Sequence, residues 1–134
     1  MSESDNTKVV ESIFANFGRG DVPGVLAALA EDVEWLIPGP SIIPYAGLRR
    51  GHEEVAQFFM ALGGAVEFEQ FEPREFVAQG DTIIVLGFER GRVRATEKVF
   101  DNPWAMRFQL RRRRVVSFRS YEDTAAVAAA FSPQ

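Results

Sequence analysis

Four long runs rich in β-branched and aromatic residues fill most of the second half of the chain. They span residues 65–79, 81–96, 98–110 and 115–121, and a composition of this kind favours β-strands. The links between them are very short, and the last link is a run of four arginines, Arg111–Arg114. Because consecutive strands joined by short links pair antiparallel, this half of the chain predicts an antiparallel meander.

The first half has the period of helices. Val10, Ile13, Phe14 and Phe17 share one face of a predicted helix. Asn6 is its expected N-cap, so residues 1–6 are predicted to be a disordered tail. Asp21 is the expected cap of a second, short helix, with Pro23 in its first turn.

A short strand is predicted at residues 33–37, followed by an irregular loop rich in proline and glycine. A third helix is expected to start after Gly51 and to end at Gly63–Gly64. Asp123 is the expected cap of a last helical segment at residues 124–131. The order α-α-β-α-β-β-β-β, with a short C-terminal helix, predicts a single α+β domain over residues 1–134, in which a curved antiparallel sheet packs on three helices.

Composition excludes several classes of function. The chain of 134 residues has a net charge of −4, one histidine and no cysteine. The negative charge argues against nucleic-acid binding, and the single histidine and missing cysteines argue against a metal site or a disulfide framework. No phosphate-binding loop or dinucleotide-binding glycine pattern is present, so no cofactor is expected. With no apolar run of membrane-span length and no signal-peptide pattern, we expect a soluble cytoplasmic protein that does not bind membranes.

Aromatic side chains indicate a ligand pocket. A strongly bent sheet that faces three helices encloses a cavity, and Trp35, Tyr45, Trp104 and Tyr121 are placed at strand ends or loop edges, where an aromatic ring can face a ligand. Phe17 and Phe59 lie on the inner faces of predicted helices. We therefore predict that these six residues bind a small apolar molecule.

Asp101 is the predicted catalytic residue, since it stands in a strand with apolar residues on both sides. Two interpretations are open. Its carboxylate pairs with Arg92 or Arg94 across the hairpin, or it points into the pocket, where desolvation would raise its pKa and make it a general acid.

The other titratable residues carry weaker predictions. His52 is expected to be an exposed residue in the first turn of its helix, the alternative being a catalytic base. Asp32 is expected in a turn or cap, and Glu89 could share a site with Arg92.

The segments "GRGDVPGVLAALAEDVEW", "PYAGLRRGHEEVAQFF", "NPWAMRFQL" and "FRSYEDTAAVAAAF" together resemble the SnoaL-like proteins of the nuclear-transport-factor-2-like superfamily. This superfamily includes ketosteroid isomerase, limonene epoxide hydrolase and polyketide cyclases. The resemblance implies a cone-shaped fold around an apolar pocket and a homodimer formed through the sheet.

The resemblance also implies where catalytic groups would stand. Of the three catalytic positions of ketosteroid isomerase, two fall at about Ile13 and Ile37, which are apolar, and the third falls at Asp101. Met106 stands where relatives often carry a histidine. The resemblance therefore implies a small, mostly apolar or polycyclic ligand and an isomerase-, cyclase- or hydrolase-type enzyme with Asp101 as its acid. The alternative is a non-catalytic ligand-binding or dimerisation module.

The four arginines map to the hairpin between the last two strands. Arg112 and Arg113 stand where related sequences have Asp-Gly, a pair that suits a tight turn with positive φ. Arginine disfavours that geometry. The run therefore predicts an unfavourable or longer turn with a solvated cationic tip that pairs with acidic residues of a neighbouring subunit.

Overall fold

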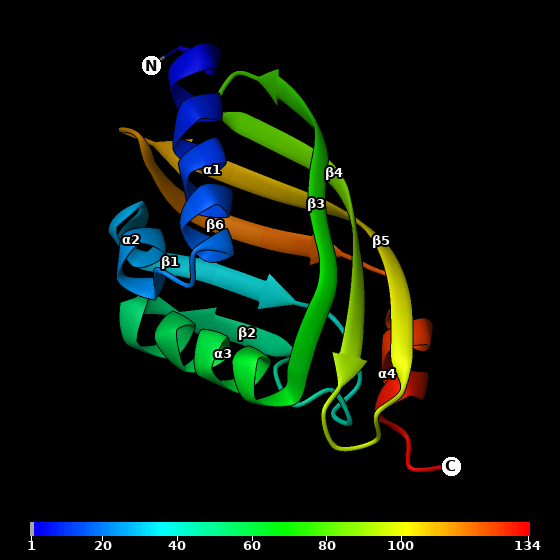
Figure 1. The fold of residues 1–134 in the computed structure, drawn as a ribbon. Coiled ribbons are helices and arrows are strands. Elements are labelled where there is room, and N and C mark those ends of the chain that lie inside the picture. Colours follow the sequence, from blue (N-terminus) through cyan, green and yellow to red (C-terminus); the bar gives the residue numbers. More distant parts are fainter. Residues whose placement is uncertain (1) are drawn as a thin grey trace.

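The computed structural model describes residues 2–134, which form four helices and six strands (Figure 1). The helices are α1 (Glu3–Gly18), α2 (Val22–Ala27), α3 (Gly51–Ala65) and α4 (Thr124–Phe131). The strands are β1 (Leu29–Ile37), β2 (Gly47–Arg50), β3 (Val66–Gln79), β4 (Thr82–Val93), β5 (Val99–Arg111) and β6 (Arg114–Tyr121).

One curved sheet holds all six strands in the order β2-β1-β6-β5-β4-β3. The predicted meander of β3 to β6 is confirmed, and every neighbouring pair is antiparallel except β1 and β6, which run parallel. The pairing of β3 with β4 is irregular at Phe68–Gln70 and at Pro73–Glu75, and Figure 1 shows that these long strands bend. Bulges of this kind increase local twist and curvature, which gives the sheet its concave face.

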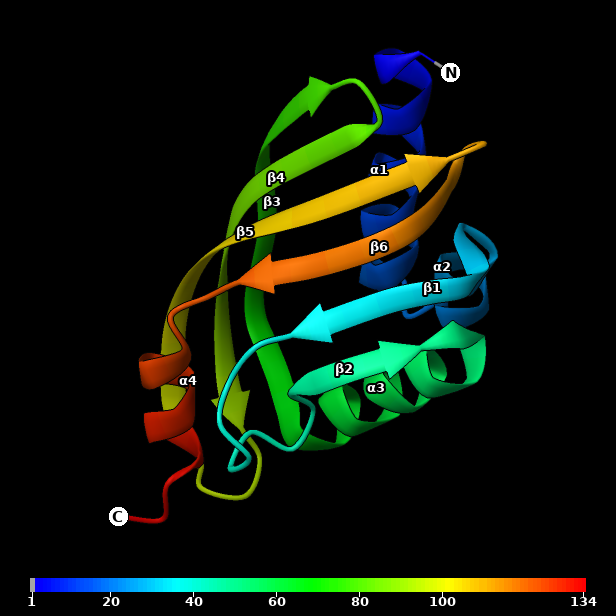
Figure 2. The same cartoon turned by 180° about the vertical axis from the view of Figure 1, so that it is seen from behind.

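Helices α1, α2 and α3 cover the concave face, whereas α4 stands at the far end beside β5 (Figure 2). The predicted α+β class, with three helices packed on the curved sheet, is confirmed. Alternation along β5 decides which side chains enter the interior. Phe100, Asn102, Trp104, Met106 and Phe108 are buried there, and the residues between them face outward.

The N-terminal segment differs from the prediction, because α1 already begins at Glu3. Ser2 is the N-cap and accepts a hydrogen bond from the backbone N–H of Asp5 at 3.0 Å. The Glu3 carboxylate accepts one from the N–H of Gly80 at 2.7 Å. Asn6, the expected cap, is fully buried inside the helix and donates to Asp81 at 3.2 Å. Contacts with the β3–β4 turn thus hold residues 3–6 in a helix rather than in a tail.

Two further boundaries depart from the prediction, and one strand was not predicted. Helix α3 continues through Gly63 and Gly64 and ends at Ala65, where the chain enters β3 directly. Strand β1 begins at Leu29 rather than at residue 33. The unpredicted strand is β2, which has only four residues and pairs with the end of β1. The caps Asp21 and Asp123 are confirmed, since each carboxylate accepts a hydrogen bond from a backbone N–H three residues later.

The arginine run forms the β5–β6 hairpin, as predicted. Arg112 and Arg113 are its two turn residues, with φ of 53° and 64°. Positive φ at both positions is the geometry of a type I′ turn, so the turn keeps its short length despite arginine. Arg113 lies 3.4 Å from Asp5 of α1 in the same chain.

Candidate functional site

A pocket lies between the concave face of the sheet and helices α1 and α3. Most of the side chains that line it are aromatic, among them Phe14 and Phe17 of α1, Phe58 and Phe59 of α3, and Phe108 and Phe118 of the sheet. The atom-free space between the lining residues, open mouth included, is about 560 Å³. Most of this wall can offer a ligand only apolar contact and ring faces.

Two carboxyl groups interrupt the apolar wall. Glu89 of β4 and Glu122, which follows β6, both line the pocket. Glu89 is 6% exposed. Asn102 of β5 is fully buried and donates hydrogen bonds from its side-chain Nδ2 to Glu89 Oε2 at 3.0 Å and to Glu122 Oε1 at 3.1 Å. Its Oδ1 accepts from the backbone N–H of Asp123 at 2.9 Å, which fixes the orientation of the amide.

Burial changes the protonation of this pair. Removal from water disfavours the charged form, and a second carboxylate nearby adds to this effect. Desolvation, followed by the charge of Glu122, raises the pKa of Glu89 to about 8, although the hydrogen bond from Asn102 opposes the change. Desolvation likewise raises the pKa of Glu122. At neutral pH the pair therefore retains at least one proton.

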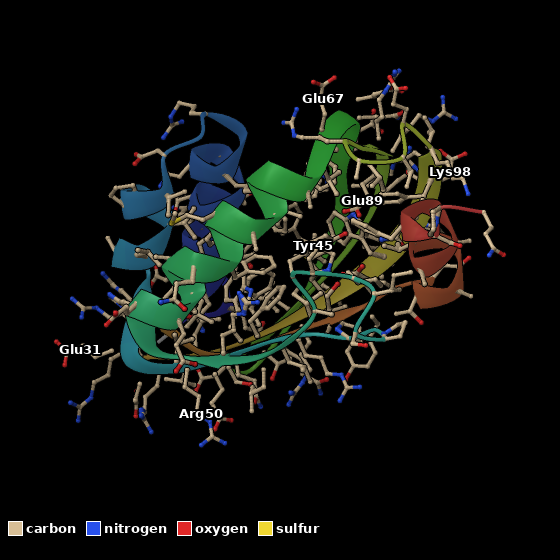
Figure 3. The ribbon with its side chains drawn as sticks, turned by 90° about the horizontal axis from the view of Figure 1, so that it is seen from below. Glu31, Tyr45, Arg50, Glu67, Glu89 and Lys98 are labelled. Atoms are coloured by element: carbon tan, nitrogen blue, oxygen red, sulfur yellow. The ribbon has the colours of Figure 1, made fainter. Side chains whose placement is uncertain are left out.

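Tyr45, from the loop between β1 and β2, completes a polar group that we call the acidic corner: Tyr45, Glu89, Asn102 and Glu122. Figure 3 shows Tyr45 and Glu89 close together between α3 and α4. Burial, and then the charges of Glu89 and Glu122, raise the pKa of Tyr45, so its hydroxyl keeps its proton. Within residues 2–134 this hydroxyl makes no hydrogen bond to the protein, although Tyr45 is only 4% exposed and lines the pocket.

Asp101 lies outside the pocket, on the convex face of the sheet. Its side chain is 52% exposed and forms a bidentate pair with Arg90, at 2.7 and 3.2 Å. Asp101 is therefore paired with an arginine rather than pointing into the pocket, but its partner is Arg90. Arg92 pairs with Glu69 and Arg94 pairs with Glu67. The neighbouring arginine lowers the pKa of Asp101. The cause of the outward position is strand alternation, because Phe100 and Asn102 take the inward positions.

Four of the six predicted ligand-binding residues line the pocket: Phe17, Trp35, Tyr45 and Phe59. Trp104 is buried beneath the wall, where its ring stacks on Phe14. Tyr121 is 48% exposed on the outer face, with Arg119 over its ring.

His52 and Asp32 take no part in the pocket. His52 is only partly exposed, and its Nε2 lies 2.8 Å from the carbonyl oxygen of Leu29, which fits neither the exposed residue nor the catalytic base that were expected. Asp32 is an exposed residue within β1 rather than in a turn or cap.

Sequence reasoning missed Glu122 and gave Glu89 the wrong partner. The sequence does hold a signal for the burial of Glu89. Inward residues alternate along β4, and Glu89 stands an even number of residues after the buried Ile83 and Val85. Glu122 follows the last strand residue and is only partly buried, and nothing in its neighbourhood in the sequence marks it as a pocket residue.

No group of three or more metal-ligating side chains comes together in the part of the chain that the structure describes. In the same part, no helix is both long and apolar enough to cross a membrane.

The fold and the pocket define a cone-shaped α+β protein with an apolar pocket between its sheet and helices. A family model for the SnoaL-like domain matches residues 10–118, and the chain belongs to this family. Among proteins with curated descriptions, none matches the chain.

Solved structures agree with the assignment. An NTF2-like protein from Burkholderia xenovorans LB400 is 43% identical, with a TM-score of 0.91 over 98% of this chain and 99% of its own. One from Burkholderia pseudomallei K96243 is 32% identical, with a TM-score of 0.89 over 98% and 99%. TerC, co-crystallised with polyporic acid, is 22% identical, with a TM-score of 0.85 over 95% and 98%, and shares the fold.

Proposed function

We propose that this protein binds a small, mostly apolar molecule in its pocket and that Glu89 and Glu122 move a proton on that molecule. The observation that carries the proposal is a buried carboxyl, Glu89, and a partly buried one, Glu122, bridged by one amide in an otherwise apolar wall. A strongly perturbed carboxyl in a pocket is a general indicator of acid–base chemistry. That TerC was co-crystallised with polyporic acid agrees with a small organic ligand for this fold.

The pair has what proton transfer requires. Glu89, with a pKa of about 8, holds a proton at neutral pH and can donate it. A catalytic group works best when its pKa lies near the operating pH. While Glu89 holds its proton, Glu122 is the carboxyl of the pair that can accept a proton from the ligand. The Tyr45 hydroxyl can donate a hydrogen bond to a ligand oxygen that gains negative charge during the reaction. Such a set serves a cofactor-independent isomerase, cyclase or hydrolase. The acid of this proposal is Glu89, because Asp101 lies on the other face of the sheet.

Deuterium exchange tests the proton transfer without the natural substrate. The probe is 2-tetralone, a small bicyclic ketone whose C1 protons exchange with D₂O. We expect the protein to accelerate exchange over buffer, and Glu89→Gln to slow the protein-dependent rate about 100-fold, the usual size of a general acid–base contribution. Asp101→Asn is the matched control and should leave the rate unchanged. Exchange no faster than in buffer, or a fully active Glu89→Gln variant, contradicts proton transfer.

The alternative function is a non-catalytic ligand-binding module. The large share of the pocket wall that is aromatic and uncharged favours it. Saturable quenching of tryptophan fluorescence by 2-naphthol, without any exchange of 2-tetralone, would select this alternative, since Trp35 lines the pocket.

A further inference from the structure

The acidic corner has no cationic partner. No lysine, arginine or histidine of residues 2–134 lines the pocket. The groups that face Glu89 are Glu122 and Asn102, and those that face Tyr45 are the two glutamates. Buried charges in proteins are ordinarily paired. This corner therefore lacks one positive charge that a ligand could supply.

The groups left open to a ligand include acceptor oxygens, beside the donors of the Tyr45 hydroxyl and of Trp35, whose buried Nε1–H has no protein partner. Asn102 Nδ2 has two hydrogens, and both are used, one by each glutamate. Glu89 keeps a second carboxyl oxygen without a protein donor, Glu122 has the Ser120 hydroxyl as its further neighbour, and the Tyr45 oxygen is unpartnered. A ligand that donates hydrogen bonds or carries positive charge fits this set better than one that only accepts them.

The walls favour a cation for an independent reason. The face of an aromatic ring carries negative electrostatic potential and attracts ammonium groups within about 6 Å of its centre. Phe59 of α3 and Tyr45 of the β1–β2 loop bring such rings to the pocket. Phe58 packs against both and already has the guanidinium of Arg49 over its ring, at 5.6 Å from the centre. Aromatic rings beside acidic side chains form a cage suited to an organic cation.

We propose that the ligand of this pocket is an organic ammonium ion with a compact apolar body, whose nitrogen binds between Glu89, Glu122 and Tyr45 while its body packs on the aromatic wall. This inference rests on the proposed function, because it names the chemical class of the molecule that the same pocket binds.

A matched pair of probes tests the charge. N,N-dimethylbenzylamine is a cation at neutral pH, whereas N,N-dimethylbenzamide has a similar skeleton but is neutral and presents a carbonyl acceptor. Binding is followed by NMR shifts of the pocket residues at pH 7. We expect the amine to bind at least about tenfold more tightly than the amide, as charge-assisted contacts require. Equal or tighter binding of the amide overturns the ammonium inference and leaves the proposed function standing. Failure of both probes to bind contradicts both.

Two variants test whether the ligand nitrogen binds at the acidic corner. Glu89→Gln keeps the acceptor for Asn102 but cannot release a proton to become the carboxylate that pairs with the cation, so it should weaken the amine about tenfold and leave the amide unchanged. Glu97→Gln, a residue that does not line the pocket, is the control and should change neither. Equal affinity of the amine for wild type and for the Glu89→Gln variant would overturn the assignment of the nitrogen to this corner.

The pH dependence of the amine's affinity is a second test of the inference. The titratable groups that face the nitrogen are Glu89, Glu122 and Tyr45. A cation favours ionised carboxylates, so binding should release protons and the amine affinity should rise between pH 6 and 8, where Glu89 titrates. The amide affinity should stay flat or fall. An amine affinity that falls over this range contradicts the inference.

Discussion

Glu89 and Asn102 face each other as register partners across β4 and β5, and the amide of Asn102 donates to the Glu89 carboxyl at 3.0 Å. The same amide reaches Glu122, and its oxygen accepts from the N-cap residue of α4. One side chain thus links the sheet, the acidic corner and the last helix. Since every polar atom of this amide is buried and used, the acidic corner depends on Asn102 for its geometry.

Replacing Asn102 by alanine should therefore destabilise the protein strongly. The change leaves the buried Glu89 carboxyl without its donor, removes one donor from the partly buried Glu122, and leaves the N–H of Asp123 without an acceptor, and each unsatisfied buried group costs about 1–3 kcal/mol. We expect a loss of about 3 kcal/mol in the free energy of unfolding, measured by urea denaturation. Gln79→Ala, an exposed change at the end of β3, should stay within about 0.5 kcal/mol of wild type. A stable Asn102→Ala variant would show that the amide does not hold the corner.

The pH dependence of stability should report the buried carboxyl. In the folded state Glu89 has a pKa of about 8, whereas in the unfolded chain it titrates near its usual value of about 4.3. Between these values the folded state binds more protons, so the free energy of unfolding falls as pH rises, by up to about 1.4 kcal/mol per pH unit. The contribution of protonated Glu89 to stability is fully present below the pKa that Glu89 has in the unfolded chain, and it is lost above the pKa that Glu89 has in the folded protein. Glu89→Gln should flatten this slope in urea titrations from pH 5 to 8, and an unchanged slope would assign it to other groups.

The fold was predictable because its signals are local. The β-like runs and short links of residues 65–121 specify a meander without knowledge of any distant contact. Strand β2 escaped detection because four residues carry no period. Helix α3 passes its two glycines because a helix interior tolerates glycine at a modest cost when the surrounding packing holds it.

The candidate site was predictable only in its aromatic part. Phe17 and Phe59 follow from helix periodicity, and Trp35 and Tyr45 follow from their positions at strand ends or loop edges. Asp101, the predicted acid, lies outside the pocket because it alternates along β5 with Asn102, and the inward position falls to Asn102. Glu122 lies beyond the strand, so its position follows from the hydrogen bond to Asn102 and not from any local pattern.

Two glycines should respond in opposite directions to alanine. At Gly87 a Cβ would overlap the Trp104 ring and lie 2.5 Å from the carbonyl oxygen of Glu72. We expect Gly87→Ala to lower the free energy of unfolding by about 2 kcal/mol, as overpacking does. At Gly63 in α3 nothing lies within 4 Å of the added atom, so Gly63→Ala should raise stability by about 1 kcal/mol through helix propensity. Urea midpoints check both, and a neutral Gly87→Ala would mean that the Trp104 ring can move aside.

The convex face of the sheet is the predicted homodimer surface. Leu86, Ala105 and Tyr121 form one row across β4, β5 and β6, and Leu86 and Tyr121 are 39% and 48% exposed. We expect sedimentation equilibrium to show a dimer that Leu86→Lys shifts toward monomer. Met60→Lys, on the exposed side of α3, is the matched control and should have no effect. A monomeric wild-type protein, or a Leu86→Lys variant that remains dimeric, contradicts this surface.

The arginine hairpin should be easy to stabilise. Arg112 and Arg113 hold φ of 53° and 64°, a region that costs a side chain such as arginine about 1–2 kcal/mol per residue. Asn-Gly suits this turn, so the double change Arg112→Asn and Arg113→Gly should raise the free energy of unfolding by about 1 kcal/mol, seen as a higher urea midpoint. The lost contact with Asp5 is solvent-exposed and offsets little of the gain. Lysine at both positions keeps the charge and the strain and should leave the midpoint unchanged. A lower midpoint for the Asn-Gly variant would show that the arginine side chains stabilise the tip by more than their backbone strain costs.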